Sequence, residues 1–443
     1  MKHKTQQTIR FWAVNLCRIL VAAAFLFSGT VKLNDPLGTQ YKIEDYGHAF
    51  GLAALIPAPI PLVLAVALGM LEFCLGVFMF FGIHRWVISR TTTLLLLFFT
   101  PLTFYLALKN PISDCGCFGD ALVLTNWQTF WKNVILLTAV LVVAWQYKTV
   151  VRFISRRSQW LITLYTWIFA LTFAIINIHG LPLIDFRPYH IGADVLKKMG
   201  MDEDKSMQYQ TYFIMEKDGV RREFTLEDYP DSTWTFIDSR TETLGGSQTL
   251  PEIHDLEIVP IDGPGKGEDI TADLLSDPSY KFLLVSPYLE AADDGVMDRI
   301  ATIYDYCREY GYQFLCLTSS GEESIAKWKD ITAAEYPFCH VDAVALKTMI
   351  RSNPGLMLLQ GSSVINKWPS TRLPREEELT EPLERLPLAH PQVSSFVRRV
   401  LRILLWYLMP ILLWTLADRL WVTWKKRNRH KYKVTNHLKE QEK

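Results

Sequence analysis

Hydrophobic residues in this chain gather into six runs, and a long, mostly polar segment lies between the fifth run and the sixth. The runs cover residues 11–32, 61–82, 91–108, 129–146, 160–180 and 401–422. A membrane-spanning helix needs about 20 mainly apolar residues, so the pattern predicts six spans, of which the third and fourth are short. The small residues of the first run lie within it rather than at its end, which favours an uncleaved span over a signal peptide.

Basic residues are distributed unequally among the loops, and this predicts the orientation of the spans. Lysine and arginine gather at residues 2–10, 85–90, 148–157 and 425–431. Loops on the cytoplasmic side carry the excess of positive charge, so both termini are predicted to lie in the cytoplasm. The alternate segments are predicted to lie outside it, namely residues 33–60, 109–128 and 181–400.

Two charged residues stand inside predicted spans, Arg18 in the first and Glu72 in the second. Counted from the outer ends of two antiparallel helices at about 1.5 Å per residue, they lie at similar depth. Because an isolated charge in a membrane is costly, such residues usually face the interior of the bundle and pair. We therefore expect an Arg18–Glu72 contact. It is either a structural ion pair or part of a proton or quinone pocket lined by Glu72.

The first outer loop has the pattern of a short helix lying on the bundle. Ile43, Tyr46 and Phe50 are spaced for one helical face. His48, in the same stretch, is expected to be a surface histidine rather than a metal ligand.

The third loop holds two of the seven cysteines, in residues 114–120, which read Asp-Cys-Gly-Cys-Phe-Gly-Asp. A disulfide between cysteines one residue apart closes a small, strained ring, and strain makes a disulfide exchange more easily. A location outside the cytoplasm permits disulfides. Cys115 and Cys117 are therefore the candidate redox pair.

The residues around this pair have opposing effects on the pKa of its thiols. Thr125 and Gln128 are placed as a capping box that opens the fourth span, and a nearby helix N-terminus lowers the pKa of a thiol. Asp114 and Asp120 oppose that shift. Two other interpretations stay open. The pair is structural and unreactive, or it binds a metal with His48, although two thiols are too few ligands for a metal site.

The polar segment contains a β-rich part followed by alternating strands and helices. Residues 209–215 and 220–225 flank a Glu-Lys-Asp-Gly turn and predict a hairpin. Strands are predicted at 281–285, 313–318, 338–341, 356–359 and 364–368, and helices at 295–310, 322–331 and 343–350. This order resembles a thioredoxin-like fold. Pro354 stands where that fold keeps a cis-proline, and X–Pro bonds alone adopt cis at small cost.

The thioredoxin-like fold places Cys-x-x-Cys after its first buried strand, but residues 286–295 contain no cysteine. The domain is thus predicted to bind or position a partner rather than to exchange disulfides. Cys307, Cys316 and Cys339 fall on predicted helices and strands, where free cysteines behave as small buried apolar residues.

The overall charge of the chain limits the classes of partner that the sequence predicts. The chain has 46 basic and 46 acidic residues, so its formal net charge is zero and nothing indicates nucleic acid. The basic tail is explained more simply as a topology anchor. The expected partners are membrane lipid and a secreted or periplasmic protein.

Three features together resemble the MauE/DoxX group of membrane proteins: the motif at 114–120, the sequence Lys-Leu-Asn-Asp-Pro at 32–36, and Glu72. The resemblance covers about residues 11–146 and implies a four-helix unit, distantly similar to the vitamin K epoxide reductase type, which exchanges disulfides with quinone. It marks Cys115 and Cys117 as the thiol pair. It also implies a bacterial inner-membrane protein, of a variant associated with Bacteroidetes-like bacteria. MauE proteins are associated with methylamine utilisation through disulfide formation in a secreted partner.

One departure affects the mechanism. The vitamin K reductase type uses Cys-x-x-Cys together with further loop cysteines, and the first outer loop here has none. The resemblance therefore does not extend to a complete thiol relay, and it does not imply direct reduction of a quinone. No cofactor is firmly predicted, and a quinone stays open.

The sequence thus predicts a six-span α-helical membrane bundle and an α/β thioredoxin-like domain outside the cytoplasm. The expected parts are the MauE/DoxX-like unit at 1–150, the fifth span and a surface segment at 151–190, a β-rich segment at 191–250, the degenerate thioredoxin-like domain at 251–375, a connector at 376–400, and the sixth span and tail at 401–443. The expected function is to exchange or support disulfides in an extracytoplasmic partner, as a thiol-disulfide oxidoreductase component. The alternative is a non-catalytic membrane scaffold with a recognition domain.

Overall fold

A computed structural model describes residues 2–52, 55–112, 115–201, 209–217, 220–224, 235–243, 251–262, 265–390 and 396–441. The chain divides into two compact units, one formed by residues 1–187 and 394–443 and the other by residues 188–393. Asp114, and the turn residues 218 and 219 of the predicted hairpin, lie outside the described residues.

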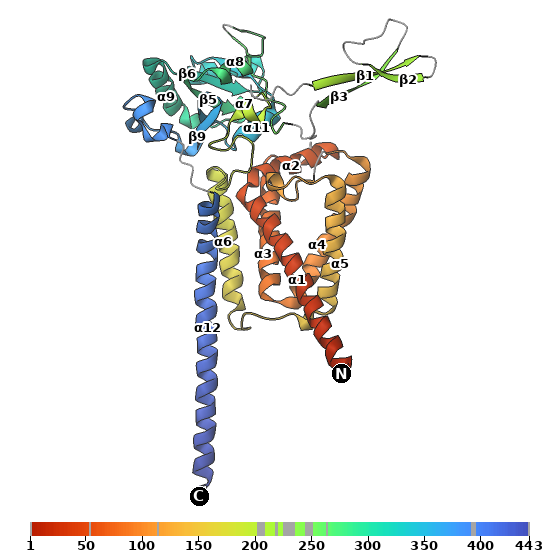
Figure 1. The fold of residues 1–443 in the computed structure, drawn as a ribbon. Helices are drawn as coiled ribbons and strands as arrows, with labels where there is room; N and C mark the ends of the chain where they lie inside the picture. The colour runs from red at the N-terminus through yellow and green to blue at the C-terminus, as the bar shows by residue number, and fades with distance from the viewer. Residues whose placement is uncertain are drawn as a thin grey trace. The chain divides into compact units, whose positions relative to one another are not determined.

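The first unit contains six helices long and apolar enough to cross a membrane, among the residues described, which confirms the predicted number of spans. They are α1 (Lys2–Asn34), α3 (Pro59–Phe81), α4 (Arg85–Lys109), α5 (Asn126–Trp145), α6 (Gln159–His179) and α12 (Phe396–Gln441) (Figure 1). The third span is longer than predicted because α4 begins at Arg85. The guanidinium of Arg90 lies 4.2 Å from the centre of the Trp86 ring, a cation–π contact within this charged first turn.

Local signals explain where these helices begin and end. The amphipathic helix of the first loop is α2 (Pro36–Ala49), with the carboxylate of Asp35 accepting from the Gly38 N–H at 2.9 Å. Gly82 ends α3 in the left-handed conformation, with φ of 69°. The predicted capping box is present, since Thr125 and Gln128 each satisfy the other's backbone N–H at the start of α5.

The helices α1 and α3 cross in direct backbone contact. A Cβ added to Gly29 would lie 2.3 Å from the Phe73 nitrogen, and one added to Gly76 would lie 2.6 Å from the Leu26 nitrogen. Small residues allow such an approach in membrane helices, where dispersion contacts replace the hydrophobic effect between helices. This crossing fixes the relative depth of every other residue on the two helices.

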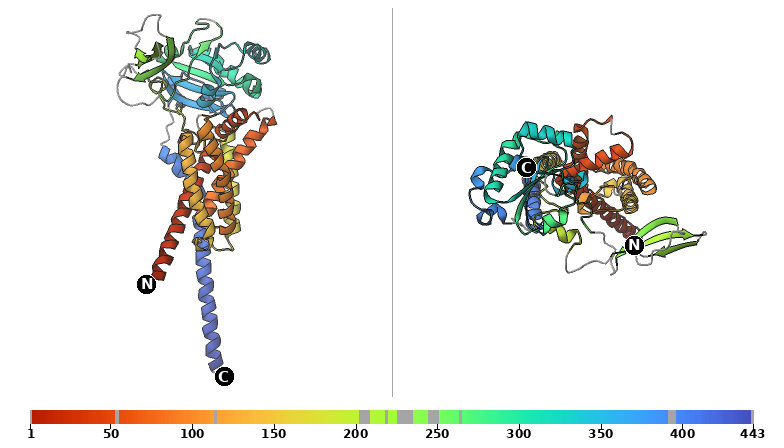
Figure 2. Two further views of the ribbon diagram at one scale, coloured as in Figure 1. Left: turned by 90° about the vertical axis from the view of Figure 1, so that its right-hand side faces the viewer. Right: turned by 90° about the horizontal axis from the view of Figure 1, so that it is seen from above.

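The last span packs against α6 and α3. The ring of Tyr407 in α12 lies 4.6 Å from that of Phe169 and 5.3 Å from that of Phe73, and its hydroxyl is 3.1 Å from the Thr166 hydroxyl. Closer to the C-terminal end of α12, the Asp418 side chain accepts hydrogen bonds from the hydroxyls of Ser155 and Ser158. Figures 1 and 2 show α6 and α12 side by side. The N-terminal part of α12 is thus a full member of the membrane unit.

The second unit is built on a six-stranded mixed sheet of order β4-β7-β6-β5-β8-β9. Its strands are β4 (Val259–Pro260), β5 (Tyr280–Ser286), β6 (Gln313–Thr318), β7 (Phe338–His340), β8 (Gly355–Gln360) and β9 (Ser363–Pro369). The central strands β5, β6 and β7 are parallel, and β8 and β9 continue antiparallel. Five of the six strands match predicted ones, and the two-residue β4 was not predicted.

Helices cover both faces of this sheet. They are α7 (Val195–Lys198), α8 (Thr271–Ser276), α9 (Met297–Tyr310), α10 (Glu322–Thr332) and α11 (Ala343–Met349). All seven residues of β5 are buried, as expected for a central strand with two covered faces. Side chains of α9 and α10 share a core with Phe282 and Leu284 of β5, and α11 contacts β5 and β6.

The predicted connector at 376–400 needs correction. Residues 376–390 form three short 3-10 turns, and Leu379, Leu383 and Leu386 belong to the core beside α9. They are buried because their spacing turns three leucines toward one apolar surface. This stretch is therefore part of the globular unit. The predicted hairpin is present as β1 (Tyr209–Lys217) and β2 (Val220–Phe224), with β3 (Thr235–Thr243) as a third strand, in the order β2-β1-β3.

Candidate functional site

The loop between α4 and α5 carries the two predicted thiols and is fastened at both ends. The amide of Asn126 donates to the Asn110 side-chain oxygen and to the Ile112 carbonyl, both at 2.8 Å. Gly116 has φ of 65°, a conformation that side chains disfavour, and the space beside it is taken by the Lys42 stem. The glycine between the cysteines is therefore required by the turn.

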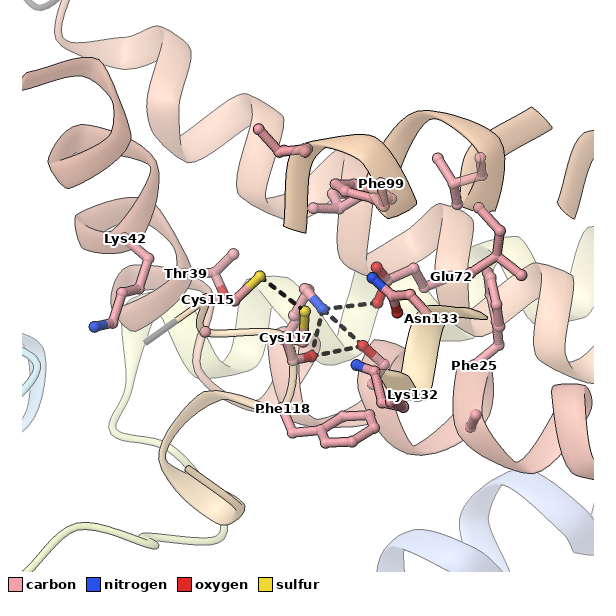
Figure 3. A pocket seen from close by; sticks show the side chains of 18 of the residues that line it. Phe25, Thr39, Lys42, Glu72, Phe99, Cys115, Cys117, Phe118, Lys132 and Asn133 are labelled. Carbon is pink, nitrogen blue, oxygen red and sulfur yellow. Dashed lines mark hydrogen bonds and ion pairs between the residues drawn. The ribbon is translucent and has the colours of Figure 1, made fainter. Parts of the chain in front are cut away.

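Cys115 and Cys117 point toward one another (Figure 3), with their sulfur atoms 3.0 Å apart. Both are free thiols, and both are half-buried. The separation is that of a hydrogen bond between sulfurs rather than of a disulfide, whose S–S length is about 2.05 Å. The Tyr46 hydroxyl of α2 donates to the Cys115 carbonyl at 3.1 Å, so the predicted surface helix contacts this loop.

A buried lysine that was not predicted as a site residue lies beneath this loop. The Lys32 ammonium donates to Glu72 Oε2 at 2.8 Å, to Ser28 Oγ at 2.7 Å and to the Cys117 carbonyl at 2.8 Å. The Ser28 hydroxyl also donates to that carbonyl, at 2.7 Å. All three ammonium hydrogens are thus used. The network joins α1, α3 and the loop, and it holds the Cys117 backbone in place.

The predicted Arg18–Glu72 contact is wrong, because Glu72 pairs with Lys32. At the close crossing, Gly29 faces Phe73, which brings Lys32, one turn further along α1, to Glu72. Arg18 is eleven residues from Gly29, about 16 Å along the helix. Its guanidinium instead donates to the Val151 carbonyl at 2.6 Å and lies 5.1 Å from the Phe153 ring. Arg18 therefore secures the segment between α5 and α6.

The thiols and the ion pair line one mainly apolar cavity of about 180 Å³. Figure 3 shows Glu72, Phe25 and Phe99 on its walls beyond Cys117. Its other apolar lining residues include Ala24, Ile43, Leu68, Leu95, Leu96, Leu102 and Leu136. Lys132 also lines it, with its ammonium 4.2 Å from the Phe118 ring centre. The cavity can hold a small apolar group in reach of a sulfur atom and a buried charge pair.

The two thiols have different acidities. The hydrogen bond from Cys115 lowers the pKa of Cys117 to about 6, and the charges of Lys132 and Lys32 act in the same direction against burial and Glu72. The same hydrogen bond, together with burial, raises the pKa of Cys115. Either sulfur can donate in this hydrogen bond, and the bond together with the nearby lysines favours a thiolate within the pair. A thiolate is the nucleophile in disulfide exchange.

The metal alternative receives no support from the described part of the chain, where no three His, Cys, Asp or Glu side chains are grouped to hold an ion. His48 is exposed on α2, as predicted for a surface histidine.

The second unit shows no thiol chemistry at the end of β5, within the residues described. The Asn353–Pro354 peptide bond is cis, the geometry predicted for Pro354. The Asn353 side chain links to the segment after β5, donating to the Tyr288 carbonyl at 2.7 Å. Cys307, Cys316 and Cys339 are buried, as predicted, and burial raises the pKa of Cys339 to about 11.

Fold and site together define a class: a multi-pass helical membrane protein with a dithiol loop over a buried ion pair and a separate globular unit with a mixed sheet. Residues 10–146 match the family model described as methylamine utilisation protein MauE. Residues 209–244 match a model described only as a domain of unknown function. No match was found among curated proteins or among solved structures. The likeness to MauE lies in α1 to α5 of this multi-pass helical membrane protein.

Proposed function

We propose that this protein exchanges disulfides with an extracytoplasmic partner through Cys115 and Cys117. The observation that carries the proposal is the pair of free thiols 3.0 Å apart, in a loop that the Lys32 ammonium holds through the Cys117 carbonyl. Two thiols within reach of one another and close to the cationic side chains of Lys32 and Lys132 are suited to thiolate chemistry. The topology predicted from the basic loops, with both termini in the cytoplasm, supports an extracytoplasmic location for the loop.

The exchange balances as two substitutions at sulfur. The Cys117 thiolate attacks one sulfur of a partner disulfide, forms a mixed disulfide and releases the other partner sulfur as a thiolate, which takes up a proton. Cys115 then loses its proton and attacks Cys117, which forms the Cys115–Cys117 disulfide and releases the second partner thiol. Two electrons pass to the partner. The reverse sequence oxidises a partner dithiol.

Lys32, Glu72 and Ser28 act as positioning residues in this proposal. Two donors on the Cys117 carbonyl hold the loop so that the sulfur atoms stay in reach of one another. The Lys32 charge also favours the thiolate over the thiol. Oxidation of a partner requires an acceptor that reoxidises the pair, and a quinone is the class of acceptor whose ring suits the mainly apolar cavity beside Cys117.

The globular unit fits the role of a recognition domain. Its sheet order and the cis bond before Pro354 favour a thioredoxin-like fold, while residues 286–295 lack cysteine. We infer that it binds or orients the secreted partner and takes no part in the exchange. The family name refers to methylamine utilisation, and a partner of this chain would be a secreted protein that needs its disulfides made or remade.

Trapping of a mixed disulfide tests the proposal. Cys115→Ser removes the resolving thiol, so Cys117 should remain linked to its partner, and non-reducing electrophoresis with mass spectrometry would identify the adduct. The double variant Cys115→Ser/Cys117→Ser should trap nothing, and Cys17→Ser should behave as the unmodified protein. If Cys115→Ser traps no partner and the native pair shows one constant redox state under all growth conditions, the scaffold alternative replaces this proposal.

A further inference from the structure

A second cavity lies at the other end of the membrane unit from the thiol loop. It has a volume of about 480 Å³ and is lined by the first turn of α4 and by the segment between α5 and α6. Arg85, Arg152 and Arg156 contribute to its wall, with Tyr147, Gln159 and Trp86. No carboxylate is among its lining residues. Three arginines thus line one cavity whose lining residues include no acidic side chain.

The backbone that carries these arginines is held firmly. Arg85 donates to the Lys148 carbonyl at 2.8 Å and to the Val150 carbonyl at 2.6 Å. The Asn15 side-chain oxygen accepts from the Val151 N–H, and the Phe153 N–H donates to the Phe81 carbonyl at 3.1 Å. The loop is therefore fixed before any ligand arrives, which reduces the entropic cost of binding.

Two of the three arginines of this cavity have no side-chain partner among the residues that the structure describes. Within the described residues, neither Arg152 nor Arg156 forms a hydrogen bond or an ion pair, and the buried Nε of Arg85 has no acceptor. The His84 side chain does not cap α4, a 25-residue helix, although the His84 N–H donates to Gln159 Oε1 at 3.5 Å. The free N–H groups of the first turn of α4 add to the positive potential. Clustered like charges repel one another, so an anion that enters the cavity relieves the repulsion and completes the missing hydrogen bonds.

We propose that this cavity binds the phosphate of an anionic phospholipid headgroup. Phosphate is the chemistry that arginine forks recognise in two-point contacts. The lipid is the favoured source because the cavity lies where α3 ends, at Phe81, and where α4 and α6 begin. Trp86 is 52% exposed and Trp160 is 63% exposed there, as aromatic side chains at a membrane interface are. Basic pockets between membrane helices commonly hold anionic headgroups.

The test is native mass spectrometry of the full-length protein in detergent, with phosphatidylglycerol or phosphatidylcholine added at equal concentration. Arg152→Gln/Arg156→Gln should weaken phosphatidylglycerol binding about 30-fold, since each basic residue at a membrane surface contributes about 1 kcal/mol. Arg156→Gln alone should show about a fivefold loss and serves if the double variant does not fold. The control is Arg157→Gln, because Arg157 lies on the same segment with its guanidinium 4.9 Å from the Trp421 ring and does not line the cavity.

The possible results distinguish a lipid site from binding by overall charge and from a site for a free anion. Loss of phosphatidylglycerol in the cavity variants, with binding retained in Arg157→Gln, supports the proposal. Equal loss in Arg157→Gln would show attraction by overall charge and overturn it, as would equal binding of phosphatidylcholine. Displacement of the lipid by millimolar inorganic phosphate would assign the cavity to a free anion and overturn the lipid source.

Discussion

The hydrogen bond between the two thiols can be tested by removing its donor. Cys115→Ala deletes the sulfur that lies 3.0 Å from Cys117 and leaves Lys32 and Lys132 in place. A hydrogen bond to a charged group contributes about 1.5–3 kcal/mol, and one pKa unit corresponds to about 1.4 kcal/mol. Because a thiol is a weak donor, the lower end applies. We expect the pKa of Cys117 to rise by about one unit, from about 6 to about 7.

The assay is the alkylation rate of Cys117 as a function of pH, read at each cysteine by mass spectrometry so that the other cysteines stay in place. Reactivity should be present above the pKa of Cys117 and lost as the pH falls through it. The midpoint of the profile is diagnostic, whereas the plateau is not, because thiolate nucleophilicity itself rises with pKa.

The matched control is Cys115→Ser, in which a hydroxyl can still donate to the thiolate. Its midpoint should stay closer to that of the native protein than the midpoint of Cys115→Ala does. If the midpoints of Cys115→Ala and the native protein coincide, the hydrogen bond does not set the acidity of Cys117. If serine and alanine shift the midpoint equally, donation is not the cause.

Three further predictions concern stability. Glu72→Gln should lower the free energy of unfolding by about 3–5 kcal/mol, because it leaves Lys32 charged without its carboxylate partner. The double variant Lys32→Met/Glu72→Leu should recover most of that loss, as measured by thermal unfolding in detergent. Equal stability of the two variants would contradict this prediction. Gly29→Val should abolish folded protein in size-exclusion chromatography because its Cβ has no room, whereas Gly321→Ala, in open space, should not. Leu383→Ala should destabilise the globular unit by about 2–5 kcal/mol in denaturant titration, and a loss below 1 kcal/mol would place residues 376–390 outside its core.

Local signals allowed much of the fold to be predicted from the sequence. The strand at Gln313–Thr318 has the predicted bounds because its apolar run begins soon after Gly311 and is followed by the turn residues Ser319, Ser320 and Gly321. The capping box at Thr125 was predictable because its two partners are three residues apart. The candidate thiols were predictable for the same reason, since they lie one residue apart in a loop.

Contacts between residues that are distant in sequence could not be predicted from such local signals. Lys32 ends the first predicted span, and the length of a hydrophobic run does not show where a neighbouring helix crosses it. The crossing depends on Gly29, whose meaning appears only against the Phe73 backbone. Leu383 was assigned to a connector because the surrounding prolines and charges outweighed it in the pattern. In both cases the decisive partner is distant in sequence.

A gain in stability does not explain why the buried Lys32–Glu72 ion pair is present. Apolar residues of similar size often replace such a pair without loss, because desolvation offsets the attraction between the charges. Apolar residues could not, however, donate to the Cys117 carbonyl, which accepts from both Lys32 and Ser28. Glu72 holds the ammonium in the membrane unit, and the ammonium holds the loop. The pair therefore links the α1–α3 crossing to the position of the thiols, and this link accounts for a charge at that depth.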